Sequence, residues 1–253
     1  MPTMNCVCGH RMQAGTPDAL FDILRAHNDE KHAELNIPDA ALHGLIRAQQ
    51  NMTPWDGETV TLEAPPRIVA LEPKHAKDVL DFFDNDAFAD NPIWASCFCY
   101  FPHHAPDFEA WNRRTGEQNR ADKAALIEQG EAHAMLAFAG DKLVGWCHAA
   151  PRVTLPMFDL RPGFETDDAD RVGSIVCFLV AAPYRGQGIA NMLLDAACDD
   201  LRDRGLAVAE SYVPKGEVSA ARAHLGTEPM YRNAGFTTHR DTDRTLIMRK
   251  PLI

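Results

Sequence analysis

The sequence predicts an α/β protein built on a mixed β-sheet, with a small additional domain at the N-terminus. From Arg67 to the C-terminus, strand-like apolar stretches alternate with helix-like ones. A glycine-containing segment joins an apolar strand to a helix, and residues 1–50 carry a separate, shorter pattern. Alternation of this kind is typical of domains in which helices cover a sheet.

The stretch after residue 66 contains an ordered series of strand and helix signals. The unbroken apolar run Gly173–Val180 indicates a buried central strand. Ile189–Arg204 has helical spacing, and Gly205 follows it where a C-cap glycine belongs. Further strands are predicted at Arg67–Leu71, Ala132–Ala139, Lys142–Ala149, Leu206–Val213, Phe236–Arg240 and Thr245–Lys250, and further helices at Lys74–Phe83, within Pro106–Gly130 and at Met230–Ala234.

Residues 1–50 predict a compact ββα-like domain. Thr3–Met12 is extended, and Thr16 then supplies an N-cap with Pro17 at the first helical position. Pro38 opens a second short helix with an apolar stripe of Leu42, Leu45 and Ile46. Because the next stretch lacks a helical period and is rich in turn formers, we predict a domain at 1–50, a linker at 51–66 and a domain at 67–253.

Composition places the chain among globular proteins and limits its partners. Hydrophobic residues make up 45% and charged residues 24% of 253 residues. The net charge of −11 disfavours nucleic acids and anionic membranes and suits a cationic acceptor such as an amine. No segment approaches the ~18 apolar residues of a membrane span. The polar start and the seven cysteines predict a cytoplasmic protein with reduced thiols or metal-ligating cysteines.

The segment Val180–Ala190 carries the clearest chemical signal. An apolar strand runs into a turn containing Gly186 and Gly188, which opens a helix. The first N–H groups of a helix lack internal partners, so the turn can bind an anion such as a pyrophosphate, and Arg185 adds positive charge. Taken alone, the pattern also fits a simple strand-to-helix turn. Its position between a strand and a helix, ahead of Met230–Phe236, favours the anion site.

This arrangement resembles the GNAT superfamily of N-acetyltransferases, whose cofactor motif is matched by Arg185, Gly188 and Ala190. The resemblance implies a splayed central strand in which N–H groups near Leu179 and Val180 receive the pantetheine of acetyl-CoA. It also implies that the pyrophosphate is held by Arg185, Gly186, Gln187, Gly188, Ile189 and Ala190. The chain is also similar to a bacterial subgroup of this superfamily over Trp94–Cys99, Val144–Arg152, Ser174–Phe178, Glu210–Pro214 and Leu225–Tyr231.

Catalytic candidates follow from the same resemblance. Tyr231 matches the general acid of the family, with a structural tyrosine as the alternative. The predicted central strand contains no acidic residue, so the general base stays open. Glu210 is the first candidate, His148 the second, and a water chain could replace both. The long segment between Tyr212 and Tyr231 departs from the usual family spacing and is expected to shape the acceptor pocket.

A separate set of residues predicts a metal site in the N-terminal domain. Cys6 and Cys8 precede His27 and His32, and a His-x4-His helix lies within known zinc spacing. Residues 1–45 also resemble a family of small predicted metal-binding proteins. The four residues are the expected zinc ligands, with buried thiols and ordinary helix-face histidines as the alternative. Six acidic and four basic residues in 1–55 disfavour a DNA-binding finger.

The remaining cysteines predict no nucleophile. Cys97 and Cys99, with His103 and His104, are expected to line the acceptor side rather than to bind a second metal. Cys147 and Cys177 lie on predicted buried strands and are expected to be core residues.

The sequence thus predicts an acetyl-CoA-dependent N-acetyltransferase that moves an acetyl group to a primary amine by direct attack in a ternary complex. A small-molecule or peptide amine is the expected partner, and a homodimer is left open. The alternative is a non-catalytic acyl-CoA sensor whose N-terminal module binds a partner protein. Transfer of a longer acyl group is a third hypothesis.

Overall fold

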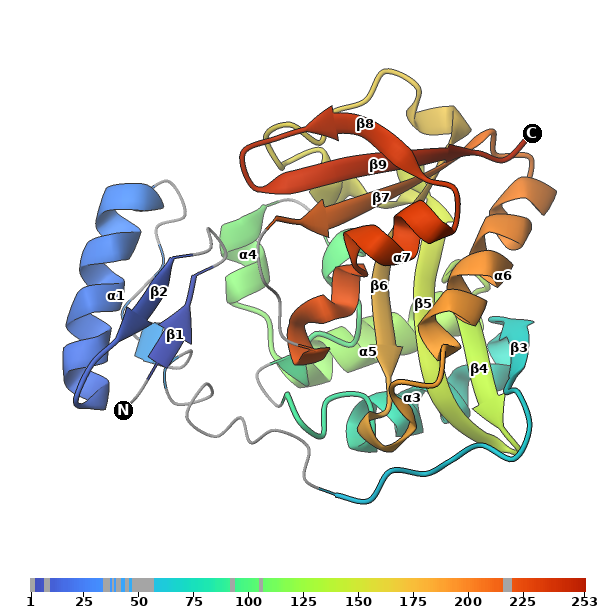
Figure 1. Cartoon of the computed structure of the whole chain (residues 1–253), viewed down its shortest axis with the longest axis horizontal. Helices are drawn as coiled ribbons and strands as arrows, with labels where there is room; N and C mark the ends of the chain where they lie inside the picture. Colours follow the sequence, from blue (N-terminus) through green and yellow to red (C-terminus); the bar gives the residue numbers. More distant parts are fainter. Residues whose placement is uncertain are drawn as a thin grey trace. The chain divides into compact units, whose positions relative to one another are not determined.

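The computed structural model describes residues 3–6, 10–33, 37, 39, 42–43, 46, 57–91, 94–104, 107–215 and 220–253. Its contacts divide the chain into two units (Figure 1). The first comprises Met1–Asp56 with Asp90–Ile93, and the second comprises Gly57–Ala89 with Trp94–Ile253. No helix among the described residues combines the length and apolar character that crossing a bilayer requires.

The first unit contains a β-hairpin and a helix. Strands β1 (Thr3–Asn5) and β2 (Arg11–Gln13) pair in antiparallel fashion, and α1 (Pro17–Lys31) follows. The N–H of Ala19 donates to the Thr16 hydroxyl at 3.2 Å, which confirms the predicted cap. The predicted helix after Pro38 lies largely outside the described residues. Two of its described residues, Leu42 and Ile46, pack in one core with residues of the hairpin and α1. The other buried residues of this core are Met4, Met12, Leu20 and Leu24.

The second unit is built on a seven-stranded mixed sheet in the part of the chain that the structure describes. The strand order is β3-β4-β5-β6-β7-β9-β8, and only β6 and β7 run parallel. The bounds are β3 Arg67–Ala70, β4 Met135–Ala139, β5 Lys142–Pro151, β6 Val172–Val180, β7 Val208–Pro214, β8 Thr237–Asp241 and β9 Thr245–Pro251. Each strand overlaps a predicted one, which confirms the expected α/β class.

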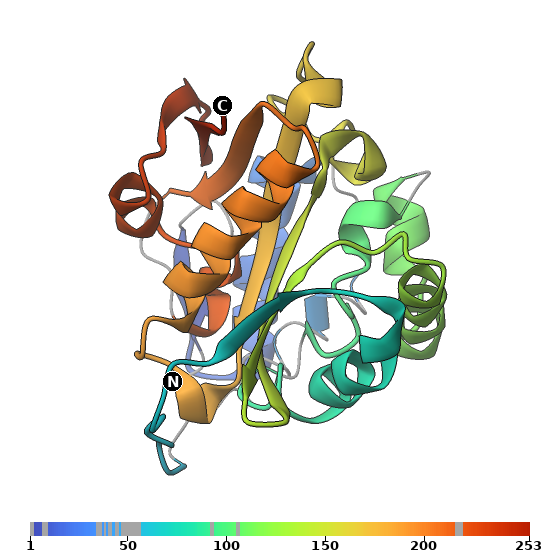
Figure 2. The ribbon, with the colours of Figure 1, turned by 90° about the vertical axis from the view of Figure 1, so that its right-hand side faces the viewer.

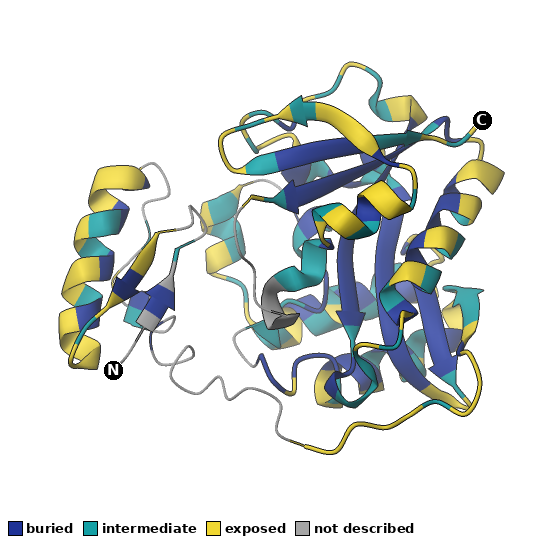
Figure 3. Cartoon of the chain, viewed as in Figure 1, coloured by how far each residue is buried: buried dark blue, intermediate teal, exposed yellow. Residues whose placement is uncertain are grey.

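Helices cover both faces of this sheet (Figure 2). The α6 face carries α6 (Ile189–Asp203) and α7 (Glu228–Asn233), and the α5 face carries α3 (Ala76–Asn85) and α5 (Gly116–Glu128). A short helix, α4 (Phe108–Asn112), precedes α5. Strands β5 and β6 are almost completely buried between the two layers (Figure 3). Such a sandwiched central pair explains why the sequence of β6 is apolar along its whole length.

Pairing between the two parallel strands stops halfway. Val172–Ile175 of β6 pair with Val208–Ser211 of β7. Beyond that point β6 continues to Val180 and β7 to Pro214 with no further pairing between them. The two strands therefore separate toward their carboxyl ends, and this gap leads directly to the glycine turn before α6.

Candidate functional site

The parting of β6 and β7 leaves backbone donors on one side of β6 without a partner in β7, beside the 3-10 helix Ala220–Leu225, which lies against both strands. The N–H of Ala181 donates to the carbonyl of Val144 at 2.9 Å, and Leu179 lies opposite Trp146 in the same register. Because N–H groups alternate in direction along a strand, those of Phe178 and Val180 point away from β5 and into the gap. Of the two residues expected to meet the pantetheine, Val180 thus directs its N–H to the gap and Leu179 directs its N–H to β5.

The turn after β6 presents a second set of donors. Gly186 and Gly188 have φ values of +77° and +79°, a left-handed conformation that favours glycine. The first helical backbone bonds of α6 are made by the N–H of Asn191 and that of the next residue, both of which donate to the Gly188 carbonyl. The N–H groups of Gly188, Ile189 and Ala190 therefore have no intrahelical acceptor, and they lie at the positive end of a 15-residue helix.

Two polar side chains hold this turn in place. The Arg185 Nε donates to the Val180 carbonyl at 2.9 Å, which brings its positive charge back over the end of β6. The Gln187 side chain donates to the Val60 carbonyl (2.8 Å) and accepts the N–H of Leu62 (2.9 Å). Val60 and Leu62 therefore belong to this site, although their sequence predicts only a linker. Gln187 is left with its backbone as its contribution to ligand binding.

Tyr231 lies on the α6 face beside the point where β6 and β7 part. Its ring is fully buried, 6.4 Å from that of Phe178, and its hydroxyl donates to the Leu225 carbonyl at 3.0 Å. Burial raises the pKa of Tyr231 well above its usual value, and the nearby Ser211 hydroxyl offsets part of the rise. Ser211 is the last residue of β7 that pairs with β6. The phenol is thus neutral and adjacent to the closed end of the gap.

Glu210 lies on the opposite face and is fully engaged. Only 1% of the residue is exposed. The Tyr212 hydroxyl donates to its Oε1 at 2.6 Å, and the Arg249 Nε donates to its Oε2 at 2.7 Å. Arg249 also pairs with Asp168 at 2.9 Å. The carboxylate therefore stabilises a buried network between β7 and β9, and both of its oxygens are in use.

His148 on β5 is the other base candidate, and it is also on the α5 face. It is fully buried opposite Cys177 of β6, and its Nδ1 lies 3.3 Å from the Cys99 Sγ. The His103 ring stacks on it with centroids 4.9 Å apart. Burial, with the positive charge of Lys123 as a smaller cause, lowers the pKa of His148 well below its ordinary value. The imidazole is therefore neutral at physiological pH.

Several buried nitrogen atoms around His148 have no hydrogen-bond partner among the described residues. They are His148 Nε2, His103 Nε2, Trp146 Nε1 and Lys123 Nζ. Phe98 and Cys99, which bring the thiol to His148, both have φ of +47°, an uncommon left-handed conformation for residues with side chains. Unsatisfied buried donors and local backbone strain are both typical of functional sites. Cys99 and His103 thus join His148, whereas His104 packs near Trp111 (5.8 Å).

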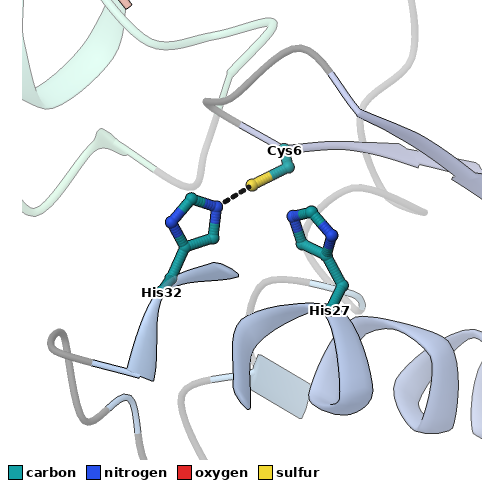
Figure 4. Close-up of side chains that lie close together, drawn as sticks. All are labelled: Cys6, His27 and His32. Atoms are coloured by element: carbon teal, nitrogen blue, oxygen red, sulfur yellow. Dashed lines mark hydrogen bonds between the residues drawn. The ribbon is translucent and has the colours of Figure 1, made fainter. Parts of the chain in front are cut away.

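Three of the four predicted metal ligands converge in the first unit (Figure 4). The ligand atoms of Cys6, His27 and His32 lie within 4.8 Å of one another, and Cys6 Sγ is 3.1 Å from His32 Nε2. His27 lies within α1 and His32 caps its C-terminus. Cys8 lies outside the described residues. The hairpin and the helix thus bring together a thiol and two imidazoles, a set of donors that suits zinc.

Several solved structures resemble the chain at low sequence identity. No protein of curated function matches the sequence. Solved structures that resemble the chain include the paiA N-acetyltransferase of Thermoplasma acidophilum in complex with coenzyme A, with 14% identity, 73% of this chain and 99% of that chain covered, and a TM-score of 0.43. An N-acetyltransferase of Staphylococcus aureus Mu50 is 12% identical, with 75% of this chain and 100% of that chain covered and a TM-score of 0.46. The GNAT domain of S. lividans PAT is 16% identical, with 74% of this chain and 90% of that chain covered and a TM-score of 0.46.

The profile of the acetyltransferase (GNAT) family matches residues 94–236, from the loop that carries Cys99 to the end of α7. This match spans more than half of the chain and contains β6, the glycine turn and Tyr231. The chain therefore belongs to the GNAT family of acetyltransferases.

Proposed function

We propose that this protein transfers an acetyl group from acetyl-CoA to a primary amine by direct attack in a ternary complex. The observation that carries the proposal is the gap between β6 and β7, which ends in the glycine turn of α6. The gap and the turn together offer a line of backbone N–H donors, which suits a substrate with a long amide-containing arm and a pyrophosphate.

In this proposal acetyl-CoA binds mainly through the backbone. The free N–H groups at the start of α6, with the charge of Arg185, hold the pyrophosphate. The pantetheine lies beside β6, where the N–H groups of Phe178 and Val180 face the gap. A donor fixed next to the thioester carbonyl stabilises the negative charge that develops there as the amine attacks.

Proton transfer is divided between the two faces of the sheet. The attacking amine forms a bond to the acetyl carbon and loses a proton, while the thiolate of coenzyme A leaves and gains one. We assign to Tyr231, on the α6 face, the proton that the thiolate gains, which requires its hydroxyl to turn from the Leu225 carbonyl to the thiolate. His148, on the α5 face, is neutral and has an unengaged Nε2, so we assign it the proton of the amine. Glu210 is occupied by Tyr212 and Arg249 and is assigned a structural role.

The pyrophosphate site is tested by Gly188→Glu. A carboxylate at this position places negative charge and bulk at the start of α6, so Kd for acetyl-CoA should rise by about 100-fold or more, as expected when several charge-assisted hydrogen bonds are lost. Titration calorimetry measures the change. Gly140→Glu is the matched control, because Gly140 also has a positive φ (+59°) with no neighbour within 4 Å, but lies in the β4–β5 turn. Equal affinity in both variants would contradict the placement.

The acid is tested by Tyr231→Phe in an assay of thiol release from acetyl-CoA with polyamine, aminoglycoside and peptide acceptors. Loss of the hydroxyl should lower kcat by about 100-fold, the usual size of a general-acid contribution, and leave acetyl-CoA affinity unchanged. Undiminished kcat would remove Tyr231 from the mechanism. If acetyl-CoA binds but no amine supports thiol release by the wild-type protein, an acyl-CoA sensor is the better explanation.

The base is tested by comparing His148→Gln with Glu210→Gln. Glutamine at 148 keeps a polar group beside Cys99 but cannot accept the proton, so kcat should fall by about 100-fold. Glu210→Gln removes a charge from a buried pair and should mainly lower the unfolding temperature. The variant should still fold, because Arg249 keeps its pair with Asp168. If Glu210→Gln is folded but inactive while His148→Gln is active, Glu210 is the base and His148 is the structural residue.

We further propose that the first unit binds zinc through Cys6, His27 and His32, with Cys8 as the fourth ligand. The support is the convergence of three ligand atoms on one point beside the hairpin. A unit this small has a core of few residues, so a metal would contribute much of its folding free energy.

The metal site is tested by elemental analysis and thermal unfolding of the whole protein. We expect close to one zinc per chain, a lower unfolding temperature of the first unit after chelation, and loss of zinc in His27→Ala. His43→Ala is a matched control. The His43 ring stacks on that of Phe21, with centroids 3.9 Å apart, and His43 is not one of the grouped ligand residues. Zinc-free protein whose first unit stays folded would refute this proposal.

A further inference from the structure

An aromatic cluster closes the α5 face of the gap at its narrow end. The rings of Phe158 and Phe164 lie 4.6 and 4.9 Å from that of Tyr212, and Val176 belongs to the same buried cluster. Val176 and Tyr212 are the first residues of β6 and β7 beyond their last pair. The cluster therefore lies where the acetyl group must be attacked if the proposed function holds.

Arg161 is attached to this cluster by its guanidinium. The group lies 5.2 Å from the ring of Phe101, 5.8 Å from that of Phe158 and 5.6 Å from that of Phe164. Within the described parts of the chain it makes no hydrogen bond and no ion pair. Burial among the rings lowers the pKa of Arg161, yet a guanidinium stays charged in proteins. Its five N–H donors therefore remain available beside apolar surface.

Two of the carboxylates close to Arg161 in sequence are committed to other arginines. Asp159 accepts from Arg152 at 2.5 Å, and Asp168 accepts from Arg249 at 2.9 Å. The chain carries 36 acidic and 25 basic residues, so acidic partners are plentiful. A partly buried arginine without such a partner is unexpected in a chain of this charge. A partly exposed guanidinium of this kind is able to pair with an anion that comes from outside the chain.

The same short turn connects Arg161 to the assigned base. Phe101, which stacks on Arg161, and His103, which stacks on His148, are the two ends of the 3-10 helix Phe101–His103. His103 Nδ1 also lies 3.3 Å from the Thr154 carbonyl, in the loop that continues to Arg161. A bound molecule could therefore direct one end to Arg161 and the other to His148.

We propose that Arg161 binds the carboxylate of the acceptor, so that the acceptor is a molecule of the amino-acid type that carries both an amine and a carboxylate. The inference rests on the proposed acetyl transfer. A planar guanidinium fork matches a carboxylate through two parallel hydrogen bonds. The neighbouring phenylalanine rings offer contact to an apolar side chain of the acceptor.

The experiment compares free amino acids with their methyl esters as acceptors in the thiol-release assay. The ester keeps the amine and the side chain but removes the negative charge. Arg161→Gln should raise KM for the free acids roughly 10- to 100-fold, as for the loss of a charge-assisted pair, and leave KM for the esters unchanged. Arg161→Lys should give an intermediate KM, because lysine keeps the charge without the fork.

The control variant is Arg120→Gln, which removes a surface pair between α5 and Asp84 of α3 and should change neither KM. Equal changes for acids and esters in Arg161→Gln would indicate a structural role and overturn the proposal. So would a wild-type preference for esters, polyamines or phosphate-bearing amines over free acids. An enzyme that binds acetyl-CoA but turns over none of these amines would instead remove the proposed function, and this inference with it.

Discussion

The parting of β6 and β7 after Ile175 and Ser211 is the constraint on which the rest of the site depends. Backbone donors inside a protein must find partners, and an unpaired buried N–H is costly. The carboxyl half of β6 has a partner in β5 on one side and none in β7 on the other. In the proposed function the amide groups of a bound acyl-CoA supply acceptors to this opening.

Alternation along the strands then separates the chemistry into two compartments. Ala209 and Val213 of β7 face the core beneath α6 together with Tyr231, whereas Tyr212 and Glu210 face the other layer. A single face could not place an acid beside the leaving thiolate and a base beside the incoming amine without bringing the two together. In the proposed mechanism the sheet keeps them apart, and both reach the same thioester at the gap.

Much of the fold could be predicted because its signals are local. The predicted strand Gly173–Val180 and helix Ile189–Arg204 each differ from the observed element by one residue, since an apolar run and a helical period need no distant information. The glycine turn was found for the same reason. Tyr231 is predicted by the family resemblance rather than by any local pattern.

The rest of the site depends on contacts that no local pattern contains. Glu210 is an isolated acid in its strand, and only the β7–β9 register reveals that Arg249 occupies it. Val60 and Leu62 lie in a stretch without helical or strand period, yet they hold Gln187 across about half of the chain. Arg161 stands in a loop whose composition indicates only exposure. Its surroundings appear once strands from distant parts of the sequence meet.

The difference between backbone donors and side chains also explains which part of the site can be common to many acceptors and which part must suit one acceptor. The donors offered to the acyl-CoA are backbone N–H groups, and these require a strand opening and two left-handed glycines rather than any chosen side chain. The α5 face instead offers His148, Cys99 and the Phe158–Phe164 cluster, all of them side chains. Hydrogen bonds to a charged group discriminate far more strongly than apolar contact does. Under our proposal the acceptor is therefore selected by side chains, and above all by the guanidinium of Arg161.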